Sequence, residues 1–208
     1  GELLSEMTDT SDAVGLCFNL QGQPFYYVTF PTGDTSLLYS EAAKKWTTLS
    51  YGVNDARHLI SSFQRVYDKN LVTDHRNGNI YELDFDSQTD NTDMIQRQRI
   101  LPTLSSAMLK SPNKRILLSK IYIDMEKGVG ILTGQGSDPV ILVETSVDGG
   151  YSWLPAEAVS TGEMGEKVLK VIAYQMASGY EITIRLTVTD PVVTVLKGVS
   201  VDMKIYGN

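Results

Sequence analysis

The fold class is predicted most directly by Tyr180-Glu181-Ile182-Thr183-Ile184-Arg185-Leu186-Thr187-Val188-Thr189, in which apolar and polar residues alternate over ten positions. Consecutive side chains of a β-strand point to opposite faces of its sheet, so this alternation predicts a strand with one apolar and one polar face. Residues 120–126 and 199–205 show the same pattern. No amphipathic helix longer than two turns is predicted, although Ser40 to Lys45 fits a single helical turn. The predicted class is all-β, built from half-buried antiparallel strands.

Turn-forming residues separate the predicted strands, at Asn77-Gly78, Asp148-Gly149-Gly150, Ser178-Gly179 and Asp190-Pro191. The polar stretch from Pro102 to Arg115 divides the chain into two regions. Residues 1–112 are predicted to form propeller-blade-like β structure. Residues 113–208 are predicted to form a small antiparallel β-sandwich of roughly six strands.

The first region contains two segments that resemble each other, residues 25–49 and 71–85. Each has short strands around a turn and an aromatic residue late in the unit, as in β-propeller blades. Two blades cannot close a ring, since propellers need about four to eight. We therefore expect the remaining blades upstream of Gly1.

Charge and cysteine content narrow the possible partners. The 208 residues include 18 Lys and Arg against 25 Asp and Glu, a net charge of −7. A surface that reads nucleic-acid sequence is expected to be basic, so sequence-specific nucleic-acid binding is not predicted, although a local basic patch stays open. No apolar run approaches the length of a transmembrane helix, so no membrane contact is predicted. The lone cysteine, Cys17, lies in an apolar stretch and is predicted to be a core residue.

Residues 146–153 match the Ser-x-Asp-x-Gly-x-x-Trp pattern of an Asp box. We expect a structural turn in which Ser146, Asp148, Gly150 and Trp153 have defined roles. Asp148 accepts backbone N–H bonds, the glycines adopt positive φ, and Trp153 packs beneath. Such boxes also occur in sialidases, where they fix the blades and do no chemistry.

No cofactor is predicted, and the only metal candidate is weak. Residues 84–93 are rich in oxygen ligands, with Asp84, Asp86 and Asp90 as possible calcium ligands. An EF-hand loop needs glycine at its sixth position and glutamate at its twelfth, where this chain has Thr89 and Ile95. A solvated hairpin loop is the preferred interpretation.

The residues do not indicate an enzyme. The seven arginines are scattered, apart from Arg97 and Arg99, which are two apart and should share a strand face. An exposed strand face is the preferred interpretation of this pair, over a clamp for a carboxylate or phosphate. No nucleophile elbow or phosphate-binding glycine loop accompanies His58 or His75, and His75 is expected at the surface.

The chain as a whole resembles the C-terminal portion of the packaged-DNA stabilisation proteins, or tail hubs, of short-tailed phages. The first stretch that carries the resemblance comprises Phe18 to Leu20, Phe25 to Phe30, Leu38 to Ser40 and Lys45-Trp46. The second runs from Asn70 to Asp84 and ends in Arg99 to Pro102. The third comprises Glu126 to Gly130, Ser146 to Trp153, Gly162 to Glu166 and Thr189 to Pro191. Relatives often carry an arginine-rich strand after the Gly-Glu turn, where this chain has residues 167–171, Lys-Val-Leu-Lys-Val.

This resemblance implies a non-enzymatic virion structural protein. It would be a tail hub that closes the portal channel, retains packaged DNA and connects to the tail needle or fibres. Its expected partners are the portal protein, other tail proteins and further copies in a ring homo-oligomer. The expected location is the virion tail, with the host cytoplasm during assembly. Exposed aromatics such as Trp46 and Tyr151 are candidate interface anchors, with a core role as the alternative.

A carbohydrate- or receptor-binding β-module is the alternative function. A glycan binder should show two or three coplanar aromatic rings on one face. A hub fragment should instead show an uncovered interface where further blades belong.

Overall fold

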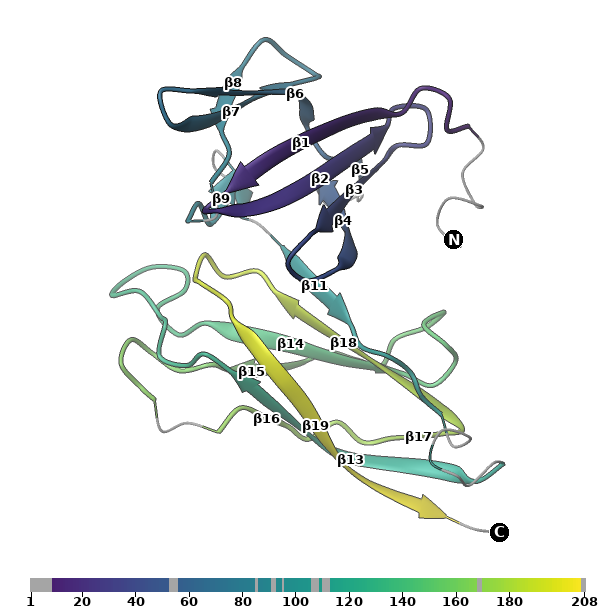
Figure 1. The fold of residues 1–208 in the computed structure, drawn as a ribbon. Helices are drawn as coiled ribbons and strands as arrows, with labels where there is room; N and C mark the ends of the chain where they lie inside the picture. Colours follow the sequence, from purple (N-terminus) through teal and green to yellow (C-terminus); the bar gives the residue numbers. More distant parts are fainter. Residues whose placement is uncertain are drawn as a thin grey trace. The chain divides into compact units, whose positions relative to one another are not determined.

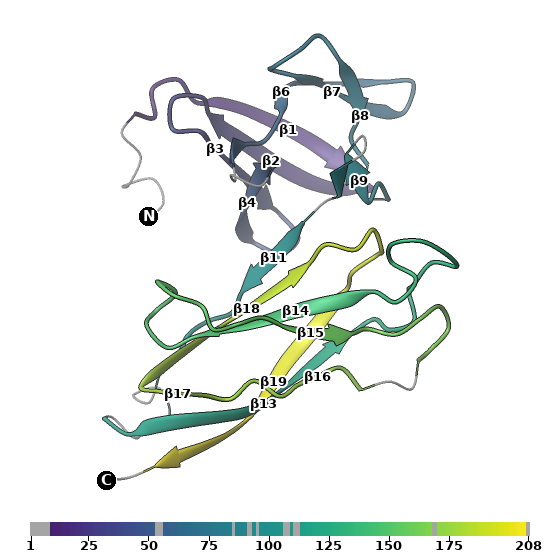
Figure 2. The same cartoon turned by 180° about the vertical axis from the view of Figure 1, so that it is seen from behind.

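The computed structural model describes residues 9–52, 56–84, 86–90, 93–94, 96–105, 109, 113–167 and 170–206. Within these ranges the chain is all-β and contains no helix, as the alternation predicts. It comprises partial blades followed by an antiparallel sandwich (Figures 1 and 2). The chain divides into two compact units, residues 1–85 and residues 86–208.

The first unit begins with a five-stranded antiparallel meander, which we call sheet A. Its order is β1-β2-β3-β4-β5. The strands are β1 (Val14–Leu20), β2 (Gln23–Phe30), β3 (Thr35–Ser40), β4 (Lys45–Tyr51) and β5 (Ala56–Arg57). The prediction of a helical turn at residues 40–45 is wrong, because a tight turn joins β3 directly to β4. Ser40 pairs with Lys45 across that hairpin.

A second antiparallel sheet, sheet C, follows with the order β6-β7-β8. Its strands are β6 (Ile60–Val66), β7 (Lys69–Asp74) and β8 (Ile80–Glu82). The sequence indicated β7 and β8 but not β6, in which Ser61, Ser62, Gln64 and Arg65 dilute the apolar alternation. One core joins both sheets, with Phe18, Phe25, Tyr27, Ile60 and Val72 buried in it.

Cys17 is exposed, so its prediction as a core residue is wrong. In β1 the inward-facing positions are Leu16, Phe18 and Leu20, which contribute to the core that joins the two sheets. Strand alternation places Cys17 on the opposite face. An apolar stretch alone does not identify which of its residues face inward.

The second unit is a sandwich of two antiparallel sheets. Sheet E has the order β11-β18-β14-β15, with β12 also paired to β18. Sheet G has β13 paired on one side with β19 and on the other with β16 and β17. The strands are β11 (Arg97–Ile100), β12 (Leu104–Ser105), β13 (Arg115–Met125), β14 (Val140–Ser146), β15 (Glu157–Ser160), β16 (Ile172–Ala173), β17 (Ala177–Gly179), β18 (Glu181–Val188) and β19 (Leu196–Tyr206). A two-stranded hairpin of β9 (Thr89–Asp90) and β10 (Asp93–Met94) precedes them.

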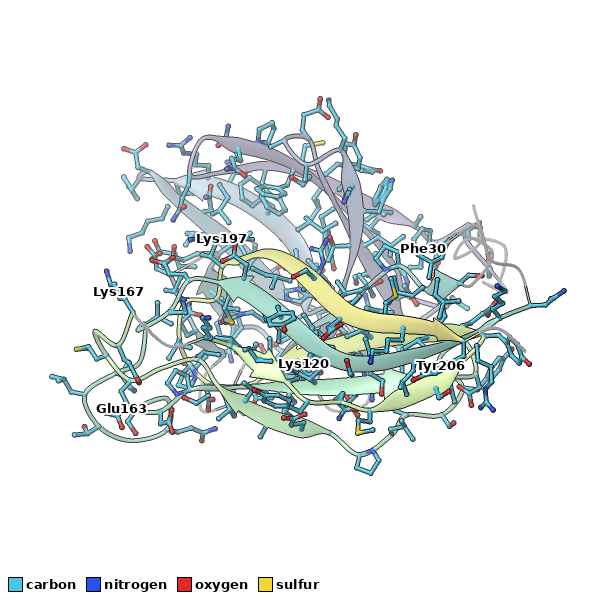
Figure 3. The ribbon with its side chains drawn as sticks, turned by 90° about the horizontal axis from the view of Figure 1, so that it is seen from below. Phe30, Lys120, Glu163, Lys167, Lys197 and Tyr206 are labelled. Atoms are coloured by element: carbon cyan, nitrogen blue, oxygen red, sulfur yellow. The ribbon has the colours of Figure 1, made fainter. Side chains whose placement is uncertain are left out.

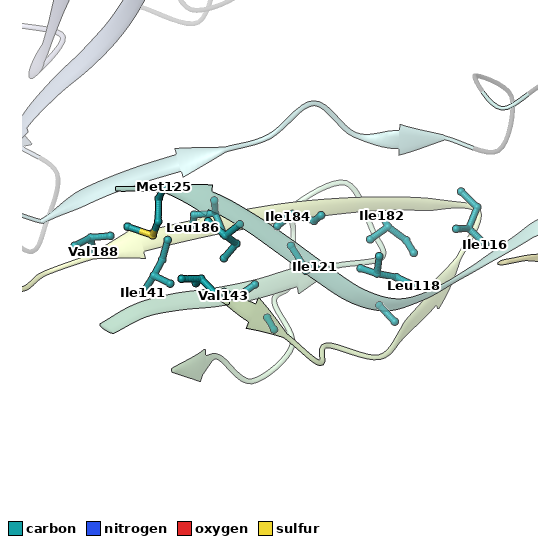
Figure 4. Packing of buried hydrophobic residues seen from close by; sticks show 14 residues of the cluster. Ile116, Leu118, Ile121, Met125, Ile141, Val143, Ile182, Ile184, Leu186 and Val188 are labelled. Carbon is teal, nitrogen blue, oxygen red and sulfur yellow. The ribbon is translucent and has the colours of Figure 1, made fainter. Parts of the chain in front are cut away.

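The sandwich core lies between the two sheets (Figure 4). Sheet G contributes Ile116, Leu118, Ile121, Ile123 and Met125, while β14 and β18 contribute the opposing layer. The alternation in β13 and in β18 therefore correctly identified the core-facing residues. Residues 178–179 do not form the predicted turn, because they belong to β17 and pair with β13.

Strand β18 differs in one respect from the half-buried strand that its sequence predicts. Thr183 and Thr187, on the face of β18 expected to meet solvent, are buried. The Oγ1 of Thr183 lies 2.9 Å from Thr103 Oγ1, and Gln98 Nε2 lies 3.5 Å from Thr187 Oγ1. The segment 97–105 lies beside β18 as the neighbouring strand of the same sheet, and its Gln98 and Thr103 side chains contact these threonines. The alternation of β18 alone could not indicate this neighbour.

The same segment places the division of the chain earlier than predicted. Residues 97–100 and 104–105 pair with β18 and therefore belong to the sandwich unit. The contacts divide the chain between Phe85 and Asp86, whereas the predicted regions were 1–112 and 113–208. A polar, proline-bearing stretch marks a loop, but here the loop joins two strands of one unit.

Candidate functional site

The Asp-box turn links β14 to β15 and uses its carboxylate internally. Ser146 donates its hydroxyl to Asp148 Oδ1 at 2.7 Å, and Ser152 donates its backbone N–H to the same oxygen at 2.9 Å. Gly149 and Gly150 have φ of 77° and 99°. Hydrogen bonds from the side chain of Ser146, and then from Ser152, hold the pKa of Asp148 well below its ordinary value. With these bonds made within the turn, the box supports the fold.

Trp153, at the end of this turn, takes part in a stack that the sequence did not indicate. The Arg185 guanidinium lies 4.0 Å from the centroid of the Trp153 ring. The same guanidinium donates two 2.7 Å hydrogen bonds to Glu144. Glu144 and Arg185 are direct neighbours on β14 and β18. Only the strand register brings them together, so no sequence spacing could have found the pair.

Arg97 and Arg99 lie on one face of β11, since they pair with Val188 and Leu186 of β18. Arg97 is half-buried and donates to the carbonyl oxygen of Val192 at 2.8 Å and to Thr194 Oγ1 at 3.0 Å. Burial lowers its pKa. The expected exposed face therefore holds for Arg99 alone, while Arg97 fixes the segment that leads into β19.

The candidate calcium ligands do not form a cluster in the part of the chain that the structure describes. Asp84 and Asp86 are exposed, and the side chain of Asp90 lies outside the described residues. Among the described residues, no group of three or more His, Cys, Asp or Glu side chains is placed to hold a metal ion.

A buried polar network surrounds Tyr27, which is fully buried. Its hydroxyl lies 3.1 Å from Ser36 Oγ and 3.2 Å from the carbonyl oxygen of Ile60. Ser36 Oγ donates to Thr29 Oγ1 and accepts the backbone N–H of His58 at 3.1 Å. The network ties sheet A to the start of sheet C. Ser36 lies close to His58, but the serine is fully buried, so a substrate could not reach its hydroxyl as a nucleophile.

A second polar cluster closes the turn between β7 and β8. The buried Asp74 accepts hydrogen bonds from the backbone and side chain of Arg76 and from the amide of Asn77. Burial raises the pKa of Asp74, but the bonds from Arg76 outweigh it, so the net shift is downward. The Arg76 guanidinium also lies 4.2 Å from the ring centroid of Tyr51. His75, beside this cluster, is exposed as expected, and partial burial with the nearby Arg57 charge lowers its pKa.

Several aromatic side chains of the first unit are exposed on one face of sheet A. Tyr26, Tyr39 and Trp46 are direct cross-strand neighbours on β2, β3 and β4, and we call them the aromatic row. Trp46 is 52% exposed and Tyr26 is 40% exposed. Ring centroids lie 5.2 Å apart for Tyr39 and Trp46 and 6.1 Å apart for Tyr26 and Trp46. Tyr151 is 95% exposed at the Asp-box turn. Both predicted anchors, Trp46 and Tyr151, are therefore at the surface.

A mainly apolar groove of about 480 Å³ adjoins the aromatic row. Cys17, Phe25 and Tyr26 from sheet A line it, and Phe63 and Arg65 come from β6. The groove lies at the edge of sheet A beside β6 and reaches the shared core, since Phe18, Phe25 and Phe63 line it. The aromatic row lies on the face of sheet A opposite that core. The alternation of residues in the sequence predicts the strands that carry the aromatic row. It does not predict the registers that bring the three rings together.

The turn at Gly162 to Glu166 forms with positive φ at Gly162 and Gly165. Residues 167–171, where the family that the sequence resembles often has an arginine-rich strand, lie partly outside the described residues, at 168–169. Lys167 and Lys170 are exposed.

Comparison with known proteins gives no assignment, since no family model matches the chain and no curated protein matches its sequence. In the portion of the chain that is described, no helix is long and apolar enough to cross a membrane.

Proposed function

We propose that this chain is a non-enzymatic structural protein of a phage virion, a tail hub that closes the portal channel and retains packaged DNA. It would connect the portal to the tail needle or fibres, in the virion tail and, during assembly, in the host cytoplasm. Blade-like sheets followed by a sandwich are the architecture that its resemblance to tail hubs implies, and this supports the proposal.

The observation that carries the proposal is the difference between the two outer faces of the first unit. The outer face of sheet C is mainly polar, with Ile80 as an exposed apolar side chain beside Thr73. Ser62 and Thr73 share a 2.7 Å hydrogen bond there, and Lys69 pairs with Glu82 at 2.6 Å. The outer face of sheet A carries the aromatic row. The last unit of a stack usually ends in a polar outer face, whereas an exposed apolar face marks a protein contact.

Charge is consistent with a channel protein. The chain has a net charge of −7. An acidic channel wall repels DNA, so DNA passes along it without adhering. Retention of DNA would then depend on closure and assembly, without base-specific contacts.

The geometry of the aromatic row favours a protein partner over a glycan. The ring planes of Tyr26 and Trp46 are 77° apart, and those of Tyr39 and Trp46 are 47° apart. A sugar ring stacks on a flat platform, and these three side chains do not supply one. The receptor-binding alternative is therefore ranked second.

The decisive experiment removes the gene from the parent phage and measures nuclease-accessible genome in purified heads. Heads that package DNA and then leak it are the expected result. Heads that keep their DNA but fail to adsorb would overturn the proposal in favour of a receptor-binding module.

A point variant tests the surface itself. Trp46→Ala should reduce incorporation of the protein into particles and increase leakage, because it removes the largest exposed ring of the aromatic row. Tyr67→Ala, at the exposed tip of the β6–β7 hairpin, is the matched control and should leave particles unchanged. Wild-type particles from a folded Trp46→Ala protein would show that the row is not the contact.

A further inference from the structure

The basic residues of the sandwich are concentrated on one sheet. Seven lie on or beside sheet G against four acidic residues, an excess of three positive charges. The four are Asp124, Glu126, Asp202 and Glu157, whose carboxylate accepts the backbone N–H of Tyr174 beside β16. We call these seven residues the basic face: Lys114, Arg115, Lys120, Lys127, Lys170, Lys197 and Lys204. Because the whole chain has a net charge of −7, the remainder of the chain has a net charge of −10.

The outward side of sheet G carries most of this charge. Its core-facing positions in β13 are apolar, and the alternate positions place Lys120 beside Asp202 of β19. Lys127 and Lys170 line a shallow groove of about 390 Å³ with Tyr122 and Asp124. Figure 3 labels Lys120 on β13 and Lys197 at the start of β19. Lys120 also lies 5.8 Å from the Tyr174 ring centroid.

The opposite charge is concentrated at the start of the chain. Residues 1–43 contain six Asp or Glu and no Lys or Arg. Asp9, Asp12 and Asp34, which we call the acidic end, gather where the chain enters sheet A. Asp12 Oδ2 accepts the backbone N–H of Thr32 at 2.7 Å, and Asp34 lies on the same turn between β2 and β3. The donors to these carboxylates include the backbone N–H groups of Ser11, Thr32 and Arg57 and the hydroxyl of Ser11. Asp9 and Asp34 are exposed to solvent.

We propose that the basic face of one copy binds the acidic end of a second copy. The two surfaces are different parts of the same chain, so the contact is heterologous and repeats from copy to copy, which closes into a ring when the rotation allows. Complementary charge selects this partner and speeds its association. A nucleic-acid partner is disfavoured, because Asp124 and Asp202 interrupt the basic face and the net charge of the chain repels a polyanion.

The contact between two copies does not depend on the proposed hub function; only the expectation that such contacts close into a ring rests on it. This inference is tested on the purified chain, so it can fail while heads still leak DNA in the gene-deletion experiment. It can equally hold if those heads keep their DNA.

The test is sedimentation velocity at high protein concentration, in about 50 mM and about 500 mM NaCl. The wild-type chain should associate at low salt, with the association weakened on the order of ten-fold at high salt, because exposed charges are screened. Lys170→Glu/Lys197→Glu/Lys204→Glu changes three exposed residues of the basic face and should remain monomeric. Lys44→Glu/Lys45→Glu/Lys69→Glu has the same net charge, lies outside the basic face and should associate like the wild type.

A mixing experiment tests the head-to-tail geometry. Asp9→Asn/Asp12→Asn/Asp34→Asn neutralises the acidic end while the amide oxygens keep the backbone hydrogen bonds, and it should also be monomeric alone. Mixed with the basic-face variant, it retains one intact contact, so the mixture should form dimers and nothing larger. Circular dichroism of each variant confirms folding.

Several outcomes would overturn the proposal. These are a monomeric wild type at low salt, association insensitive to salt and to both triple variants, or a mixture that stays monomeric. Binding of a short DNA duplex by a monomeric wild type would replace the second copy with nucleic acid.

Discussion

Arg185 lies 4.0 Å over the ring of Trp153, and this contact joins the Asp-box turn to the central strand of sheet E. Two hydrogen bonds to Glu144 fix the position of the guanidinium. A cation above an aromatic ring is stabilised by the negative face of the ring, and more so when the group is partly shielded from water. The turn is thereby attached to the sheet through a side-chain stack as well as through its backbone.

Trp153→Ala should lower the free energy of unfolding by about 1 to 3 kcal/mol, because it removes the ring that covers Arg185. Urea titration followed by circular dichroism measures the change. Tyr151→Ala, at the exposed side chain two residues earlier, is the control and should change stability by less than about 0.5 kcal/mol. Equal effects of the two substitutions would contradict a specific role for the stack.

Asp148 should make stability depend on acidity. Its folded pKa lies below the ordinary value of 3.8, so its contribution is complete above that value and is lost as the pH falls toward the folded pKa. Asp148→Ala should therefore flatten the fall in melting temperature below about pH 4. Parallel melting curves for both proteins down to about pH 2 would show that the carboxylate does not contribute in this way.

Tyr27→Phe should destabilise the first unit by about 1 to 3 kcal/mol, since it leaves the buried Ser36 hydroxyl and Ile60 carbonyl without the phenol. The volume of the core is unchanged, so the loss reports on hydrogen bonding. Urea unfolding gives the size of the effect. Tyr67→Phe removes a hydroxyl from a 94% exposed side chain and should be neutral.

Gly128 and Gly134 offer a matched pair of glycines with positive φ, 70° and 87°. A Cβ on Gly128 would lie 2.9 Å from the backbone nitrogen of Glu166, whereas a Cβ on Gly134 meets nothing within 4 Å. Gly134→Ala should lower the free energy of unfolding by about 1 kcal/mol, from backbone conformation alone. Gly128→Ala should lower it by clearly more, because the new Cβ also meets the backbone of Glu166. Thermal unfolding separates them, and a larger loss at Gly134 would contradict the close approach of the two loops.

The alternation of apolar and polar residues was enough to predict the class of the fold and much of the sandwich core. Side chains alternate strictly across a strand, so the pattern in residues 180–189 and 120–126 was sufficient to orient β18 and β13. The sequence also predicted the Asp-box turn, because Ser146, Asp148 and Gly150 interact within five residues of one another. Local geometry depends on local residues, and such features can be predicted without knowledge of the rest of the molecule.

The pairing of the strands and their registers could not be predicted from the sequence and are known from the three-dimensional structure. The pairing of β11 with β18 moved the division of the chain to residue 85, and the register of β14 with β18 brought Glu144 to Arg185. The same holds for the aromatic row and for the exposure of Cys17, since a strand has two faces and its own residues do not show which face another sheet will cover. These contacts join residues far apart in the chain, and their positions depend on the packing of the whole unit.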